Sequence, residues 1–274
     1  MSELPAHWRP WLREAELAHT SLTEGLRLLH KARFASPGGF TQAFFGLSIG
    51  FERTMKLIFL IDYGMKNDGV LPTKQYMKNS VGHDLLMLYR EVGQITGELE
   101  ADGVEFEFVI PDPHLVERIL GVLNEFAQRT RYYNLDVLSR DAAPGRDPLD
   151  AWATDVGKYV LEHYPKRSAA ADERNATSLD DALAGRAIVR HTDLDGSSID
   201  SIRAHFLAGT RDEWVQAQAT FHAATLGRHL HSVLKELCWR NRRGSLLELP
   251  DLWEGTACLY NSDDYLRKRK TFTR

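Results

Sequence analysis

The chain of 274 residues contains only two cysteines, Cys238 and Cys258, and carries a formal net charge of only −4 at pH 7. Two cysteines are too few for a disulfide framework or a cysteine-rich zinc site, so a reducing cytoplasm is the simplest location. The weakly acidic balance argues against broad non-specific attraction to nucleic acid, but it leaves room for a local basic site.

The sequence also lacks the motifs of several enzyme classes. It contains neither Gly-x-Gly-x-x-Gly nor the Gly-Lys-Ser/Thr phosphate loop, which excludes the nucleotide-binding folds built on them. The His-Glu-x-x-His motif is missing, and we expect no nucleophile elbow. His222 and His229 lie two helical turns apart, about 10 Å, which is too far for one metal ion. We interpret them, with His231, as scattered surface residues and predict neither a metal nor a cofactor.

No apolar run is long enough to cross a membrane. Residues 1–17 lack the apolar core of a secretory signal, and the most apolar stretch is interrupted by Glu52, Arg53 and Lys56. We therefore expect no membrane segment. With 43% hydrophobic and 26% charged residues, the chain can bury a substantial core in one large or two small globular units.

Residues 40–63 predict a long helix at the centre of an all-α helical bundle. Apolar residues recur there at three- and four-residue steps, at Phe44, Leu47, Phe51, Met55, Ile58 and Phe59. Glu52, Arg53, Lys56 and Tyr63 fall on one polar side, and Glu52 precedes Lys56 by four residues, the favourable order for an ion pair. This side is either a solvent-facing or interface stripe, or a charged cluster facing a cleft shared with other helices.

Capping signals and apolar periodicity predict further helices along the chain. We expect them over residues 10–34, from residue 85 onward, and over 113–138, 148–164, 198–207 and 212–240. Residues 104–110 alternate between apolar and polar, which indicates a short strand or an extended lid over the bundle.

The chain divides into two predicted regions. Residues 1–146 form the first helical bundle, and residues 147–274 contribute additional C-terminal helices. Residues 166–197 are polar and rich in alanine, aspartate and glycine, without a sustained apolar period, so we expect a flexible insertion or a domain boundary there.

Three patches carry a family resemblance: GFERTMK at residues 50–56, KNSVGHDLL at 78–86 and RYYNLD at 131–136. In their order and helical context they resemble the HEPN superfamily, over about half of the chain. The resemblance implies a bundle of four or five helices, a homodimer, and RNA or a nucleotide as a partner. It also implies a setting in bacterial defence or a toxin–antitoxin system.

In active members of that superfamily, the resemblance implies a metal-independent ribonuclease with an Arg, four to six residues, then His on the fourth helix. The arginine would help to activate the 2′-hydroxyl or hold the phosphate, and the histidine would act as general acid or base. Residues 136–138, which follow Arg131 at that spacing, contain no histidine. The predicted catalytic set is therefore Arg131 and Asn134 with His83 from another helix.

The accompanying binding residues are predicted to be Glu52, Arg53, Lys56, Asp84, Tyr132 and Asp136. Two structural alternatives stay open. Asp84 can simply cap a helix, with His83 as its neighbour. Arg131, Asn134 and Asp136 can form a buried polar network that holds the fourth helix against Glu52 and Arg53, because buried charges persist only when paired.

Two functions are consistent with these patterns. The first is a HEPN-like protein associated with RNA or a nucleotide, with metal-independent ribonuclease activity as its chemistry. The alternative is a non-catalytic helical interaction or scaffold protein, in which the charged cluster is structural and the C-terminal half binds a protein partner.

Overall fold

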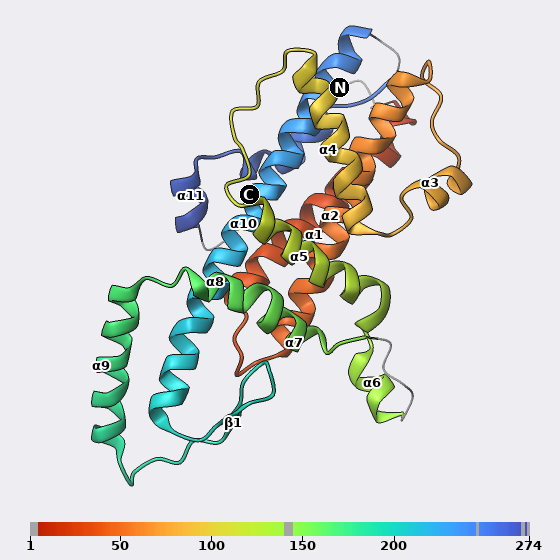
Figure 1. Cartoon of the computed structure of the whole chain (residues 1–274). Coiled ribbons are helices and arrows are strands. Elements are labelled where there is room, and N and C mark those ends of the chain that lie inside the picture. The colour runs from red at the N-terminus through yellow and green to blue at the C-terminus, as the bar shows by residue number, and fades with distance from the viewer. Residues whose placement is uncertain (1–4, 140–144, 245–246, 270–271, 273–274) are drawn as a thin grey trace.

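A computed structural model describes residues 5–139, 145–244, 247–269 and 272. It confirms the predicted all-α helical bundle. The α-helices are α1 (Trp8–Lys31), α2 (Gly38–Lys66), α3 (Lys74–Ser80), α4 (Leu85–Ala101), α5 (Pro113–Glu125), α6 (Tyr133–Leu138), α7 (Pro148–Ala151), α8 (Lys158–Glu162), α9 (Lys166–Leu183), α10 (Ile202–Gly244) and α11 (Asp263–Lys268). The longest of them run side by side and form the bundle (Figure 1).

Shorter elements complete the described part of the chain. Two π-helical segments, η1 (Phe126–Thr130) and η2 (Trp152–Gly157), interrupt the helices predicted over 113–138 and 148–164. One 3₁₀ segment is η3 (Leu252–Leu259). The strands β1 (His191–Thr192) and β2 (Ser198–Ile199) form an antiparallel hairpin, in which His191 pairs with Ile199. None of the described helices combines the length and apolarity that a membrane span requires.

Helices α1 and α2 pack so closely that their backbones touch. A Cβ atom on Gly50 would lie 2.6 Å from the backbone N and Cα of Leu22, and one on Gly46 would lie 2.8 Å from the Cα of Gly25. Only glycine fits at such a crossing, because any side chain would meet backbone atoms that cannot move aside. The close contact fixes the position of α2, whose predicted role as a central helix is confirmed by its contacts with α1, α4, α5 and α10.

The same stretch spells Gly-x-Ser-x-Gly, from Gly46 to Gly50, the letters of a hydrolase nucleophile elbow. The elbow needs a sharp strand-to-helix turn, whereas these residues lie inside α2. Ser48 is 3% exposed, and its hydroxyl donates a hydrogen bond to the Phe45 carbonyl at 3.2 Å. The glycines serve helix packing, and the serine is not an exposed nucleophile.

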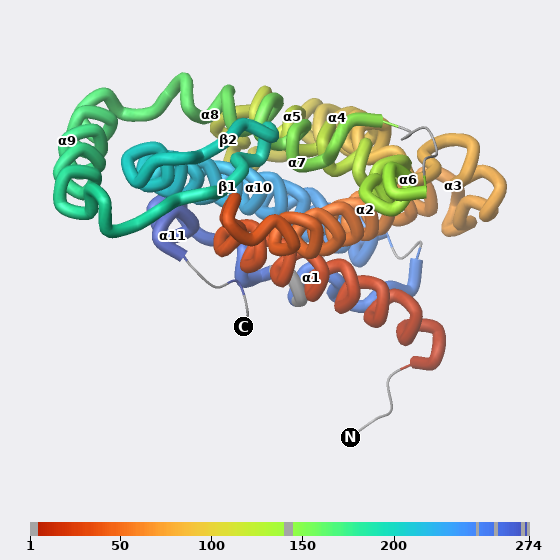
Figure 2. The backbone as a smooth tube through the Cα atoms, turned by 90° about the horizontal axis from the view of Figure 1, so that it is seen from below, coloured from red at the N-terminus to blue at the C-terminus, as the bar shows by residue number. Residues whose placement is uncertain are grey.

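Helix α10 spans 43 residues and packs against α1, α2, α5, α8 and α9 (Figure 2). The prediction of two separate helices, over 198–207 and 212–240, is wrong, because the intervening Ala208-Gly209-Thr210 contains no proline and continues the helix. The prediction of surface histidines is also wrong: His222 and His231 are 8% and 1% exposed. They face the core because α10 is surrounded by other helices over much of its length.

One hydrophobic core joins the two predicted regions. The ring of Trp152 in η2 packs against Phe44 of α2 with ring centroids 5.1 Å apart, and Phe126 of η1 lies 5.5 Å from the same Phe44. Buried apolar residues of α10, including Leu230 and Leu234, belong to the same cluster. The regions 1–146 and 147–274 therefore share their core.

Residues 104–110 are extended without forming a strand. Their even-numbered side chains are half-buried, and Phe106 and Phe108 contact His229 and Tyr260, so the alternation marks a segment lying over the bundle. Residues 166–197 contain α9 and β1, although they lack a sustained apolar period. Helix α9 packs on the first half of α10 and forms because its alanines favour a helix; its predicted flexibility stays a prediction.

Candidate functional site

The outer face of α2 carries a cluster of Glu52, Lys56 and His83. The Oε1 atom of Glu52 accepts a hydrogen bond from Lys56 Nζ at 2.7 Å and lies 2.8 Å from His83 Nδ1. The Glu52 side chain is only 19% exposed, whereas that of His83 is 79% exposed. The predicted Glu52–Lys56 ion pair is therefore present, and the carboxylate also holds an exposed imidazole.

Glu52 is held in its charged form. Burial by itself would raise the pKa of this carboxyl, but the hydrogen bonds and charges of Lys56 and His83 lower the pKa below its ordinary value of 4.5. An ionised carboxylate only accepts hydrogen bonds, so Nδ1 of His83 must carry the hydrogen. In the neutral imidazole this leaves Nε2 as a proton acceptor at the surface, the state that a general base requires.

The turn between α3 and α4 positions His83. Gly82 has a positive φ of 51°, a conformation that glycine adopts without strain, and its N–H donates to the Met77 carbonyl at 2.9 Å. Asp84 then caps α4: its Oδ1 accepts the N–H groups of Leu86 at 3.0 Å and Met87 at 2.9 Å. Asp84 therefore caps α4, as one of the two interpretations of the sequence predicted. The cap fixes the backbone next to His83.

Arg131, Tyr132 and Asn134 form a second group at the end of η1, where all three are exposed. An Nη atom of Arg131 donates to the Ala127 carbonyl at 2.7 Å, and its guanidinium lies 5.8 Å from the centre of the Phe45 ring. These residues border a hollow of about 200 Å³ between η1, α6 and the start of α7. Among the described residues the guanidinium donates to the Ala127 carbonyl, and a guanidinium has five N–H groups, enough to bind a phosphate as well.

The predicted buried network of Arg131, Asn134 and Asp136 with Glu52 and Arg53 is wrong. Arg131 and Asn134 are exposed, and Asp136 is half-buried. Arg53 instead points to α1, where it donates to both carboxylate oxygens of Glu14 at 2.6 and 2.7 Å. The physical reason is the helical spacing: adjacent residues lie about 100° apart around the helix axis, so Arg53 leaves the face that Glu52 and Lys56 share.

The two groups lie on one face of α2 at different heights. Phe45, beside Arg131, and Glu52, beside His83, are seven residues apart, which is two turns or about 10 Å of helix. Figure 1 shows the adjoining helices α6 and α3 on the same side of the molecule, separated along α2. One chain therefore presents an acid–base group, His83 with Glu52, and a cation, Arg131, that are not in contact.

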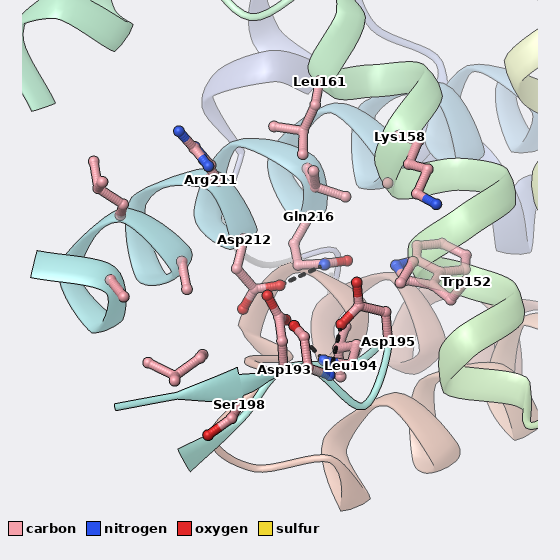
Figure 3. Close-up of a pocket in the computed structure, with 18 of the residues that line it drawn as sticks. Trp152, Lys158, Leu161, Asp193, Leu194, Asp195, Ser198, Arg211, Asp212 and Gln216 are labelled. Carbon is pink, nitrogen blue, oxygen red and sulfur yellow. Dashed lines mark hydrogen bonds between the residues drawn. The ribbon is translucent and has the colours of Figure 1, made fainter. Parts of the chain in front are cut away.

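The sequence reasoning missed a pocket in the C-terminal half, shown in Figure 3. Its floor includes Asp212 and Gln216 of α10, which are 9% and 1% exposed. A usable signal was present: two polar residues four apart on an otherwise apolar face of a long helix suggest a buried polar pair.

Within the described ranges, no three His, Cys, Asp or Glu side chains are grouped closely enough to bind a metal ion. No family model, curated protein or solved structure matches the chain.

Proposed function

We propose that the protein is a HEPN-like RNA-associated protein that contacts RNA through the outer face of α2 and cleaves it without a metal ion. The observation that carries the proposal is the exposed imidazole of His83, whose Nδ1 lies 2.8 Å from the ionised Glu52. A carboxylate behind the imidazole orients the ring and fixes the tautomer that leaves Nε2 free to accept a proton, as a general base requires.

The chemistry follows from the groups on this face. Nε2 of His83 takes the proton of a ribose 2′-hydroxyl, and the 2′ oxygen attacks the adjacent phosphorus while the bond to the 5′ oxygen breaks. The products are a 2′,3′-cyclic phosphate and a 5′-hydroxyl. One proton leaves the 2′-hydroxyl for His83 and one proton is added to the departing 5′ oxygen, so the step needs no net proton. Arg131 lies beside Phe45, two turns along α2 from Glu52, where it neutralises another phosphate of the strand. This charge interaction strengthens RNA binding.

The test is RNA cleavage and binding by purified protein in the presence of EDTA. We expect His83→Ala to lose cleavage by a factor of about 10²–10⁴, the usual contribution of an acid–base group, while it still binds RNA. Arg131→Ala should weaken binding and reduce its salt dependence. The matched controls are His114→Ala on α5 and Arg9→Ala on α1, two exposed residues outside the predicted site. Undiminished cleavage and binding in folded His83→Ala and Arg131→Ala variants would rule out the site.

A second candidate function is a non-catalytic interaction protein. It is favoured by α6, where Leu135, Val137 and Leu138 are 60%, 49% and 78% exposed. Large apolar side chains gathered on one short helix are typical of an interaction surface. We propose a second copy of the chain as the occupant, since α6 directly follows the Arg131 group and a homodimer would join two such groups.

The oligomeric state tests this candidate. Light scattering of the wild type should give twice the chain mass, and Leu135→Glu should give a monomer, because a buried unpaired charge opposes association. The control is Leu179→Glu, a partly exposed leucine on α9. A wild-type monomer, or a dimer that Leu135→Glu leaves intact, would contradict a homodimer formed through α6.

A further inference from the structure

A pocket of about 420 Å³ lies between η2, α8, the β1–β2 hairpin and the first half of α10 (Figure 3). Its walls are largely apolar and include Leu161 of α8 and Leu207 and Val215 of α10. The volume falls in the range of about 300–1,000 Å³ typical of small-molecule sites. Its η2 wall is a π-helical segment, a distortion that occurs frequently at functional sites.

Gln216 supplies a hydrogen-bond acceptor to the floor of this pocket. Its Nε2 donates to Asp212 Oδ1 at 2.9 Å, while Asp212 Oδ2 accepts the backbone N–H of Phe34 at 2.9 Å. The carboxylate fixes the orientation of the amide, because a flipped amide would turn its oxygen towards Asp212. Gln216 Oε1 is buried and has no hydrogen-bond partner among the described residues. Figure 3 shows this oxygen on the side away from Asp212, towards Trp152.

Trp152 supplies a donor. Its side chain is fully buried, and its ring is held by Phe44 and Phe40, with centroids 5.1 and 6.3 Å away. The indole Nε1–H can only donate, and within the described part of the chain it has no acceptor. Buried polar groups normally find partners, so an unpaired acceptor and an unpaired donor at one pocket point to a ligand that pairs with both.

The rim of the pocket carries both cations and carboxylates. Asp193 and Asp195 accept the backbone N–H groups of Leu194 at 2.7 Å and Ser197 at 3.0 Å, so their carboxylates serve the hairpin. Arg203 and Arg211 both pair with Glu173 of α9. Lys158 also lines the pocket and is exposed; it makes neither a hydrogen bond nor an ion pair with any described residue, although its charge helps to lower the pKa of the nearby Asp195. Among the described cations of the rim, Lys158 is therefore the one open to an anionic group.

We propose that this pocket binds a small organic anion that carries an amide group. The amide N–H donates to Gln216 Oε1, the amide C=O accepts from Trp152 Nε1–H, and the anionic group pairs with Lys158. A carboxylate alone could not satisfy the floor, since it has no hydrogen for Gln216. The site lies apart from the outer face of α2, and the proposal does not depend on RNA association.

The test is a titration followed by ¹⁵N NMR of the tryptophan indole N–H signals. The chain has six tryptophans, and a Trp152→Phe variant identifies the Trp152 signal. Two anionic amides are added at millimolar concentration, orotate with its amide in a ring and N-acetylglycine with an open-chain amide. Their neutral counterparts are uracil and N-methylacetamide. We expect at least one anionic amide to shift the Trp152 signal saturably and its neutral counterpart to bind about tenfold more weakly, since a charge-assisted contact is missing.

Variants separate the site from general effects. Lys158→Gln should weaken binding about tenfold, and Gln216→Met should abolish the shift of the Trp152 signal. The controls are Lys74→Gln, an exposed lysine on α3, and Thr220→Val, which removes a buried hydroxyl of α10 that lies outside the pocket and has no partner among the described residues. Binding by orotate alone would assign a ring amide, and by N-acetylglycine alone an open-chain amide. No saturable shift with either anion, or equal binding by the neutral compounds, would overturn the proposal, as would unchanged affinity in Lys158→Gln.

Discussion

The backbone N–H of Phe34 donates to Oδ2 of Asp212 at 2.9 Å, across 178 positions of the chain. This bond ties the connection between α1 and α2 to α10, and the same carboxylate orients Gln216 at the pocket floor. A single buried aspartate thus joins the N-terminal bundle to the wall of a pocket in the C-terminal half.

Removing this carboxylate should destabilise the fold. We expect Asp212→Ala to lower the free energy of unfolding by about 1–3 kcal/mol, because two buried donors lose their acceptor. Asp212→Asn should cost less, because its amide oxygen keeps one of the two hydrogen bonds, and the neutral amide avoids the desolvation penalty that raises the pKa of Asp212. Urea denaturation measures both, with the exposed Asp181→Ala on α9 as control. Equal free energies of unfolding for Asp212→Ala and Asp181→Ala would show that the hydrogen bonds of Asp212 do not stabilise the fold.

Glu52 should contribute to stability in a pH-dependent way. Its pKa in the fold is lowered from 4.5, so the stability it adds is present above that value and is lost as the pH falls through the folded pKa. We expect Glu52→Gln to unfold with less dependence on pH in this acid range than the wild type. Thermal unfolding followed over a pH series measures the difference, and the exposed Glu105→Gln serves as control. If the stability of the wild type and of Glu52→Gln fell by the same amount as the pH was lowered, Glu52 would not be the source of this pH dependence.

Three histidines of α10, of which His222 and His231 are buried and His229 is half-buried, should oppose folding in mild acid. Burial lowers the pKa values of His222, His229 and His231 from 6.5 to about 4. The unfolded chain then binds more protons than the fold, so stability is complete above 6.5 and decreases as the pH falls towards 4. His229→Gln, which cannot titrate, should lose less stability over this range. Denaturation curves above pH 6.5 and near pH 4 measure the difference, with a variant of the exposed His163, His163→Gln, as control.

The α1–α2 crossing should tolerate no side chain at Gly50. We expect Gly50→Ala to lower the free energy of unfolding by about 1–3 kcal/mol or more, because its Cβ would lie 2.6 Å from the backbone of Leu22. Gly93→Ala on α4 has nothing within 4 Å of its Cβ and should raise stability by about 0.5–1 kcal/mol through helix propensity. Denaturation curves of the two variants measure both changes. If both substitutions changed the free energy of unfolding in the same direction, the close contact at Gly50 would be contradicted.

Local patterns predicted the features that depend on neighbouring residues. Apolar periodicity predicted α2 and its ion pair between Glu52 and Lys56, and Asp84 was recognised as a capping candidate, because each depends on residues within about one turn. The same reasoning fails over α10, where it predicts two helices, over 198–207 and 212–240, although packing on several helices makes one continuous helix.

The sequence by itself determined that the chain is helical, where most helices lie and that Glu52 and Lys56 pair on one side of α2, because periodicity, caps and one-turn spacings are encoded within a few residues. Only the tertiary structure decided that Glu52 lies against His83 while Arg53 turns to Glu14, and that Gln216 and Trp152 line one pocket. These pairs join residues from different helices, and their distances depend on how the helices cross. Side-chain packing over the whole core sets how the helices cross. At Gly50 the lack of a side chain lets the backbones of α1 and α2 touch.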